Sequence, residues 1–364
     1  MIKIPLYKPS LDGNERRYVL ECLDSTWISS KGRFIRDFES SFARSIGVEH
    51  AVAVCNGTIA LHLALLALGL GPGQEVIVPT FTFVASVNSI SYTGARPVFV
   101  DSVPDTWQMD PAEVKKKITP RTRAIMAVHL YGHPCPLDAL AEIADENRFR
   151  LIEDCAEAFG SKFAGRPVGS FGHIAAFSFF GNKTITTGEG GMVVTNDRAL
   201  YETASHLKGQ GLVAGREYWH DVVGYNYRMT NICAAIGLAQ LERCNEFIAK
   251  KRQIAEWYKE FLRGAPIVFQ KEGKDIVHSY WMVTILAEDQ TQRDGLRSFL
   301  VQAGIETRPT FFPAHTMPMY LEKNSSYPVA EDLSRRGINL PSWPGLTRDD
   351  IRAVSETILK YWKR

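Results

Sequence analysis

Seven short apolar segments between residues 50 and 195 limit the possible folds of this chain more than any other feature. They read HAVAV, EVIVP, RPVFV, RAIMAV, FRLIED, HIAAFSFF and GMVVTN, and helical patterns separate most of them. Strands this uniformly apolar are buried on both faces, which is typical of parallel β-α-β packing. The sequence therefore predicts an α/β fold with a large, mostly parallel seven-stranded sheet. The last two segments are too close for a helical crossover, so we expect that pair to be antiparallel.

The pattern changes after Thr230. A stretch without proline, residues 231–262, predicts one long helix that Thr230 or Asn231 caps. A smaller α+β segment follows it. We therefore expect a large domain over residues 1–245 and a small C-terminal α+β domain over residues 246–364, with the long helix as the bridge.

Composition excludes several classes of partner. The net charge is +2 and the basic runs are short, as at Lys115–Lys117, so no nucleic acid is expected. No apolar run reaches the roughly 18 residues that span a bilayer, so no membrane is expected. The six cysteines form no C-x-x-C pair and residues 1–15 hold no apolar signal core, which predicts reduced thiols and a cytoplasmic location. His129 and His133 lack a third ligand, so no metal site is predicted.

Asn56, Gly57 and Thr58 stand between the first strand and a helix. A helix start offers free N–H groups and the positive end of the dipole, so an anion can bind there. Thr58 can also act as a plain N-cap, and this motif alone favours the N-cap.

A carboxylate, Asp154, ends an apolar strand at the edge where α/β sheets bind ligands. Burying it is costly unless it meets a cation or hydrogen-bond donors. Glu153 and Glu157 are close by in sequence. This cluster alone suits a metal site as well as a pair of catalytic acids.

Lys183 follows another apolar strand at the same expected edge. Burial lowers the pKa of a lysine amine, and a neutral amine can condense with an aldehyde. A surface lysine in a loop is the alternative. The sequence argues against this alternative, because the other groups that an aldehyde cofactor needs occur in order along the chain.

Pyridoxal phosphate is an aldehyde whose requirements match these groups. Its phosphate suits the Asn-Gly-Thr turn, where Ser178 adds a hydroxyl donor, and its ring nitrogen suits Asp154. Phe81 or Phe83 offers a flat apolar face for the ring. The sequence thus predicts pyridoxal phosphate as cofactor and Lys183 as its Schiff-base lysine.

Several longer motifs carry a resemblance to a known family. They read VIVPTFTFVASVNSI, EDCAEAFGSKFAGRPVGSFGHIAAFSF, NKTITTGEGGMVVTND and GYNYRMTNICAAIGLAQLE. In this order they resemble the DegT/DnrJ/EryC1/StrS sugar aminotransferases over nearly the whole chain. The resemblance implies the aspartate aminotransferase-like fold, called fold type I, with pyridoxal phosphate as cofactor.

The resemblance also implies roles by position. Lys183 and Asp154 are the implied catalytic residues. The implied cofactor contacts are Lys183, Asp154, Gly57, Thr58, Phe83, Ser178 and Asn226. Asn226 is expected to reach the phosphate in the other subunit, which implies a homodimer with shared active sites. Glu157 stands where many relatives have Gln or His, so its role stays open, although it is placed beside the cofactor.

The candidate substrate contacts are Arg308, His315, Trp27 and Lys31. Arg308 suits a carboxylate or a diphosphate, with an interdomain salt bridge as the alternative. His315 resembles a substrate-contact position of the family. Trp27 and Lys31 lie in a segment that is near the active site in relatives.

Within the family, the resemblance is to members that move the amino group of L-glutamate to C4 of GDP-4-dehydro-6-deoxy-D-mannose. That reaction serves O-antigen and lipopolysaccharide biosynthesis. An acceptor linked to UDP or dTDP and a non-catalytic regulatory role are the alternatives. The presence of Lys183 argues against the dehydratase branch, where histidine replaces this lysine.

Overall fold

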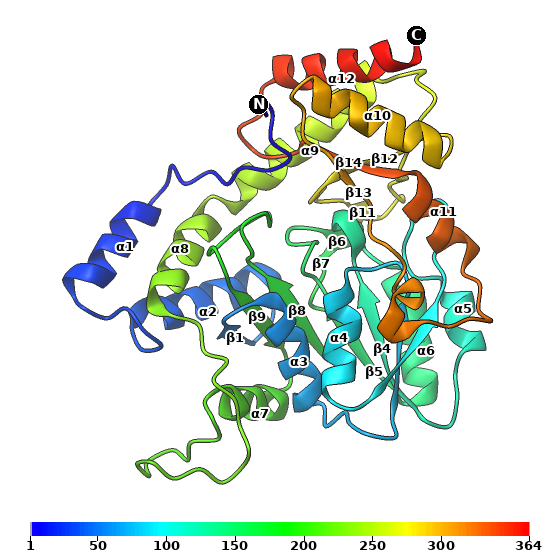
Figure 1. Ribbon diagram of the computed structural model, residues 1–364. Coiled ribbons are helices and arrows are strands. Elements are labelled where there is room, and N and C mark those ends of the chain that lie inside the picture. Colours follow the sequence, from blue (N-terminus) through cyan, green and yellow to red (C-terminus); the bar gives the residue numbers. More distant parts are fainter. Residues whose placement is uncertain (1, 364) are drawn as a thin grey trace.

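The computed structural model describes residues 2–363 as an α/β protein built on one large sheet (Figure 1). The strand order is β1-β9-β8-β5-β4-β2-β3. The strands are β1 (His50–Val54), β2 (Glu75–Pro79), β3 (Arg96–Val100), β4 (Thr122–Val128), β5 (Arg150–Asp154), β8 (Ile174–Ser178) and β9 (Gly191–Thr195). Each apolar segment forms one of them. β9 pairs antiparallel with both neighbours and the other pairs are parallel, so the predicted sheet and its antiparallel pair are confirmed.

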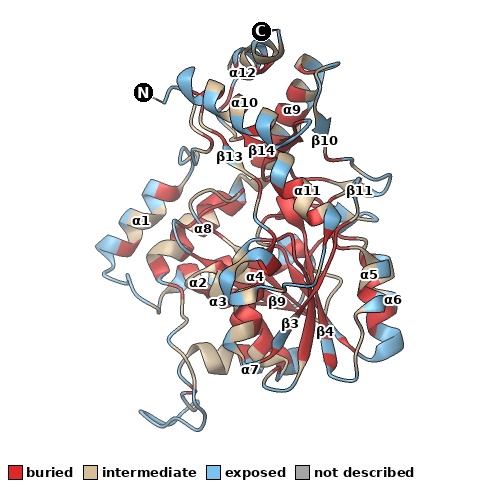
Figure 2. Ribbon diagram, turned by 45° about the vertical axis from the view of Figure 1, so that its right-hand side comes forward, coloured by how far each residue is buried: buried red, intermediate tan, exposed pale blue. Residues whose placement is uncertain are grey.

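The uniform apolar character of the strands follows from two cores, one on each face of the sheet. Alternate residues of β1 show this: Ala51 and Ala53 belong to one core, whereas Val52 and Val54 belong to the other. Helices cover both faces, and the strands between them are almost wholly buried (Figure 2). The covering helices are α2 (Arg33–Ile46), α3 (Gly57–Ala67), α4 (Val84–Tyr92), α5 (Pro111–Lys116), α6 (Leu137–Asn147) and α7 (Arg198–Lys208).

The prediction of a single long helix after Thr230 is wrong. Two helices form instead, α8 (Asn231–Glu242) and α9 (Cys244–Phe261). Arg243 separates them with φ −108° and ψ 6°, outside the helical region. The break allows each helix to serve a different core, since α8 packs on α1 (Glu15–Asp24) and α2, whereas α9 packs on α12 (Arg348–Trp362). The expected cap is confirmed, because the Thr230 hydroxyl accepts the N–H of Cys233.

The C-terminal part has its own sheet and core. The sheet order is β10-β12-β14-β13. Its strands are β10 (Val268–Phe269), β12 (Val283–Leu286), β13 (Arg308–Pro309) and β14 (Gly337–Leu340), and the helices around it are α9, α10 (Gln290–Gln302), α11 (Pro328–Arg336) and α12. The N-terminal segment also lies here, since Ile4 pairs with Ile305. The two ends of the chain are therefore both near the small sheet (Figure 1).

A third, three-stranded sheet lies between these parts. It consists of β6 (Lys162–Phe163), β7 (Arg166–Pro167) and β11 (Ile276–Val277). Short 3-10 helices occur at η1 (Leu130–Gly132), η2 (Ala314–Thr316) and η3 (Pro318–Tyr320). Among residues 2–363, no helix combines the length and apolar character that crossing a membrane requires.

An aromatic cluster under the sheet provides a test of the packing. Phe42 is fully buried, and its ring centroid lies 5.0 Å from that of Phe177, 5.3 Å from Phe179 and 5.5 Å from Phe159. We expect Phe42→Ala to lower the free energy of unfolding by about 3–5 kcal/mol in urea titrations, because it leaves a cavity in a rigid cluster. The control Val301→Ala, at a half-exposed site on α10, is expected to cost less than about 1 kcal/mol. Equal costs for the two variants would contradict the packing.

Candidate active site

A cavity of about 630 Å³ opens at the carboxyl ends of the parallel strands and brings together eight of the predicted site residues. They are Gly57, Thr58, Phe83, Asp154, Glu157, Ser178, Lys183 and Arg308. Residues from the small sheet close its other side, including Met282 and Asn339. The cavity is therefore a cleft between the two sheets, the usual place for a ligand in a fold of this type.

One end of the cavity is suited to an anion. Helix α3 begins at Gly57, so the N–H groups of its first turn have no acceptor within the helix. Asn56 caps the helix, because its side chain accepts the N–H of Ile59 at 2.9 Å; the expectation that Thr58 is the N-cap is wrong. The Thr58 hydroxyl, which lines the cavity, is thus not used by the helix.

The absence of a side chain at Gly57 keeps this anion end open. A Cβ atom there would lie 2.6 Å from the Cβ of Ser178, which is closer than real contacts allow. The Ser178 hydroxyl therefore approaches the helix start directly. This arrangement of N–H groups and hydroxyls is a typical phosphate cradle.

Asp154 is the buried acid of the site. It ends β5, with the side chain of Ser86 donating to one oxygen at 2.7 Å and the N–H of Ala156 donating to the other at 3.0 Å. Burial raises the pKa of Asp154, and these two hydrogen bonds oppose that shift. A cation placed next to this carboxylate would relieve the cost of its burial.

Lys183 lies in the loop between β8 and β9, and its amine reaches into the same cavity. Burial lowers the pKa of Lys183, while the charges of Glu157 and Asp154 act in the opposite direction. Its Nζ lies 3.9 Å from Oε1 of Glu157. The amine is thus both poorly hydrated and held by carboxylates, which is the environment of a reactive lysine.

Glu157 is almost fully buried beside the amine. Burial raises the pKa of Glu157 to about 7, with Lys183 opposing the shift, and its Oε2 accepts the N–H of Tyr131 at 2.9 Å. A carboxyl group with this pKa can hold or release a proton near neutral pH. The structure therefore makes Glu157 a direct neighbour of Lys183, a role that the sequence left open.

Arg308, on β13, lies at the mouth of the cavity with 60% of its side chain exposed. Its nearest carboxylate is Glu306, at 3.8 Å in the same segment, so it does not form the interdomain salt bridge considered as an alternative. A loosely held arginine at the mouth can bind a carboxylate or a phosphate group.

The other predicted substrate and cofactor contacts lie outside this cavity in the single chain. The ring of His315 is buried, and its Nδ1 lies 2.7 Å from the Thr80 hydroxyl. Asn226 is exposed in the segment between α7 and α8. Trp27 and Lys31 line a separate surface pocket of about 600 Å³. Their predicted roles remain predictions.

Sequence reasoning missed several residues that complete the cavity. Trp281 and Phe311 line it, and Nε1 of Trp281 donates to the carbonyl of Asn182 at 2.7 Å. The hydroxyl of Tyr7 donates to the carbonyl of Lys183. These contacts join residues at least 99 positions apart, and no local motif marks them.

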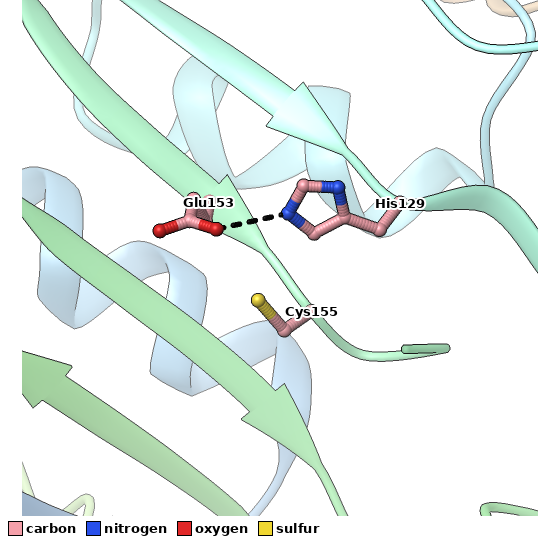
Figure 3. Close-up of side chains that lie close together, drawn as sticks. All are labelled: His129, Glu153 and Cys155. Atoms are coloured by element: carbon pink, nitrogen blue, oxygen red, sulfur yellow. Dashed lines mark hydrogen bonds and ion pairs between the residues drawn. The ribbon is translucent and has the colours of Figure 1, made fainter. Parts of the chain in front are cut away.

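Within residues 2–363, one group of side chains could hold a metal ion: His129, Glu153 and Cys155 (Figure 3). Two of these three residues, His129 and Glu153, already have hydrogen-bond partners within the protein. Glu153 accepts from Nε2 of His129 at 3.1 Å and from the N–H groups of Gly169, Phe171 and Gly172.

The protonation of Cys155 also disfavours a metal. Burial strongly raises the pKa of the Cys155 thiol, which keeps it protonated. Burial opposes ionisation of Glu153, but the hydrogen bonds to this carboxylate hold its pKa below the usual value. The cluster is best explained as a polar network that fixes the end of β5 next to Asp154.

The residues present fit pyridoxal phosphate. The anion cradle, the buried acid and the amine lie around one cavity, which the exposed side chain of Phe83 also lines. With the sheet order described above, they define a pyridoxal-phosphate-dependent enzyme of fold type I.

The chain belongs to the DegT/DnrJ/EryC1/StrS aminotransferase family, whose model matches residues 9–359. It is 59% identical to a GDP-perosamine synthase of Escherichia coli O157:H7, over 99% of this chain and 98% of the relative. It is 52% identical to a GDP-perosamine synthase of Vibrio cholerae, over 99% of both chains. Among solved structures it resembles that of S. venezuelae DesV in complex with a ketimine intermediate, with a TM-score of 0.91. The two chains are 36% identical, and the match covers 96% of this chain and 95% of that one. The protein is thus a transaminase that uses pyridoxal phosphate.

The pair of Lys183 and Glu157 gives the first functional test. The negative charge of Glu157 raises the pKa of Lys183, so Glu157→Gln is expected to lower the half-point of the Lys183 titration. The measurement is trace acetylation of the cofactor-free full-length protein from pH 6 to 11, with the Lys183 peptide quantified by mass spectrometry. The surface variant Glu202→Gln is the control and should leave the half-point unchanged. A rise in the half-point with Glu157→Gln would contradict the assigned interaction.

Proposed function

We propose that the protein has the activity of a GDP-perosamine synthase. It transfers the amino group of L-glutamate to C4 of GDP-4-dehydro-6-deoxy-D-mannose and produces GDP-perosamine and 2-oxoglutarate, for O-antigen and lipopolysaccharide biosynthesis. The full-length likeness to two GDP-perosamine synthases supports this substrate. The observation that carries the chemistry is the buried amine of Lys183, 3.9 Å from Glu157 in the cavity at the sheet edge.

Each group around the cavity has a distinct task in this proposal. Lys183 would hold the cofactor covalently, Asp154 would pair with its ring nitrogen, and Phe83 would cover one face of the ring. The first turn of α3 and Ser178 would bind the phosphate. When bound, pyridoxal phosphate accepts the electron pair of the broken C–H bond and carries the amino group between the two substrates.

The remaining work is proton transfer, and the chain supplies the groups for it. The lowered pKa of Lys183 makes its amine more available as a base than that of an ordinary lysine, so it can take and return the α-proton of the amino donor. Glu157, with a pKa of about 7, can exchange a proton with that amine. Arg308 at the mouth would bind a carboxylate of glutamate or the diphosphate of the sugar nucleotide, which the site accepts in turn.

A homodimer is part of the proposal. The segment between α7 and α8 extends away from the sheet (Figure 1), and Tyr218 and Val223 on it are 92% and 88% exposed. Large apolar side chains on an extended segment favour a partner surface. Asn226 at the end of this segment is the residue proposed to reach the second subunit's phosphate site. A cytoplasmic location belongs to the same proposal and is supported by six free cysteines.

The substrate assignment is tested by incubating the enzyme with L-glutamate that carries isotopically labelled nitrogen. GDP-, UDP- and dTDP-linked 4-keto-6-deoxy sugars are offered separately, and the products are weighed. We expect label in the GDP-linked product at a rate well above the other two. Faster conversion of the UDP- or dTDP-linked sugar would overturn the choice of acceptor but not the transaminase assignment.

The role of the amine is tested with Lys183→Ala. Loss of the base should reduce turnover by about 10²–10⁴-fold. Lys360→Ala, which changes an exposed lysine of α12, is the matched control and should retain full turnover. Full transamination by Lys183→Ala would exclude this lysine from the chemistry.

A further inference from the structure

We infer that Trp281 and Tyr131 are positioning residues whose stacked rings set the separation of Lys183 and Glu157. This inference rests on the proposed function of that pair. Neither residue belongs to a sequence motif of the site. Each of them contacts one member of the pair directly, and the two also contact each other.

Trp281 holds Lys183 in two ways. Its Nε1–H donates to the carbonyl of Asn182, which fixes the backbone next to the lysine. Its ring faces the amine, with Nζ of Lys183 3.9 Å from the ring centroid. At this distance the electron-rich face of an indole favours the charged ammonium form. The amine therefore has both an aromatic face and the carboxylate of Glu157 as neighbours.

Tyr131 holds Glu157 through its backbone. Its N–H donates to Oε2 of Glu157 at 2.9 Å. This geometry depends on a left-handed conformation at Tyr131, with φ 58° and ψ 9°, which a bulky residue rarely adopts. Such strain persists only where the surroundings enforce it, and it is concentrated at functional sites.

The surroundings that enforce this conformation are aromatic. The side chain of Tyr131 is fully buried, and its ring is nearly parallel to that of Trp281, with an interplanar angle of 5° and centroids 6.2 Å apart. On the same ring Phe311 stacks at 5.4 Å and 15°, and its N–H donates to the Tyr131 hydroxyl. Trp281, which contacts Lys183, and Tyr131, which contacts Glu157, are thus parts of one aromatic stack.

The stack also joins the two halves of the site. Lys183 and Glu157 come from loops of the large sheet, whereas Trp281 lies two residues before β12 of the small sheet. A shift between the sheets would therefore change the environment of the amine. The ionisable groups that share the cavity or contact Lys183 are Glu157, Asp154, Arg308, Glu189, Tyr92 and Tyr7.

The inference is tested by the same acetylation titration of Lys183 in the cofactor-free full-length protein. Trp281→Leu removes the aromatic face but keeps an apolar side chain, so we expect the half-point to fall by about half a unit to one unit. Trp281→Phe retains a weaker aromatic face and should give a smaller fall. Tyr131→Leu removes the support of the indole and should also lower the half-point.

A matched control exists outside the site. Trp343 also donates its Nε1–H to a backbone carbonyl, that of Pro5, and has Lys8 over its ring at 5.9 Å. Trp343→Phe should leave the Lys183 half-point unchanged. Circular dichroism and gel filtration establish that each variant is folded. If Trp281→Leu does not fold, the half-point of Lys183 in Trp281→Phe is compared with that in the unchanged protein, and this comparison tests the inference.

Two outcomes would overturn the inference: an unchanged half-point in the folded Trp281 variants, or a rise in it. The titration contains no sugar nucleotide and no glutamate. A failure of the proposed substrate therefore leaves this result intact, and an unchanged half-point in the Trp281 variants leaves the transaminase assignment intact.

Discussion

The interaction on which the site depends is the buried contact between the amine of Lys183 and the carboxylate of Glu157, with Asp154 close by. Burial favours the neutral form of each group, and the opposite charges favour the ionised forms. Because burial outweighs the attraction between the charges, the pKa of Lys183 falls and that of Glu157 rises to about 7. Glu157 can therefore hold or release a proton near neutral pH beside an amine that is more easily deprotonated than an ordinary lysine.

The fold explains why these groups meet. Parallel strands place their carboxyl ends at one edge, so Asp154 at the end of β5 and the loop after β8 that carries Lys183 open into one cavity. The same edge receives the start of α3, where Gly57 leaves room for an anion. The two cores require apolar residues on both faces of the strands, so the polar groups of the site are confined to the strand ends.

Much of this arrangement could be predicted from local pattern. The apolar runs determine the strands, Asp154 and Ser178 are the last residues of two of them, and Lys183 follows in the loop after β8. The break at Arg243 could not be predicted, because no proline or glycine marks it and the need for it arises from two separate cores. The cap at Asn56 was missed because Asn56 and Thr58 are equally plausible caps by residue type. Trp281 and Tyr131 were missed because their roles depend on contacts between distant parts of the chain.

We propose that Lys183 is the one amine that carries the cofactor. Borohydride reduction of the cofactor-bound protein, followed by peptide mapping by mass spectrometry, tests this directly. We expect the mass of the reduced cofactor on the peptide that contains Lys183 and on no other lysine. Attachment to a different lysine, or no attachment to any peptide, would contradict it.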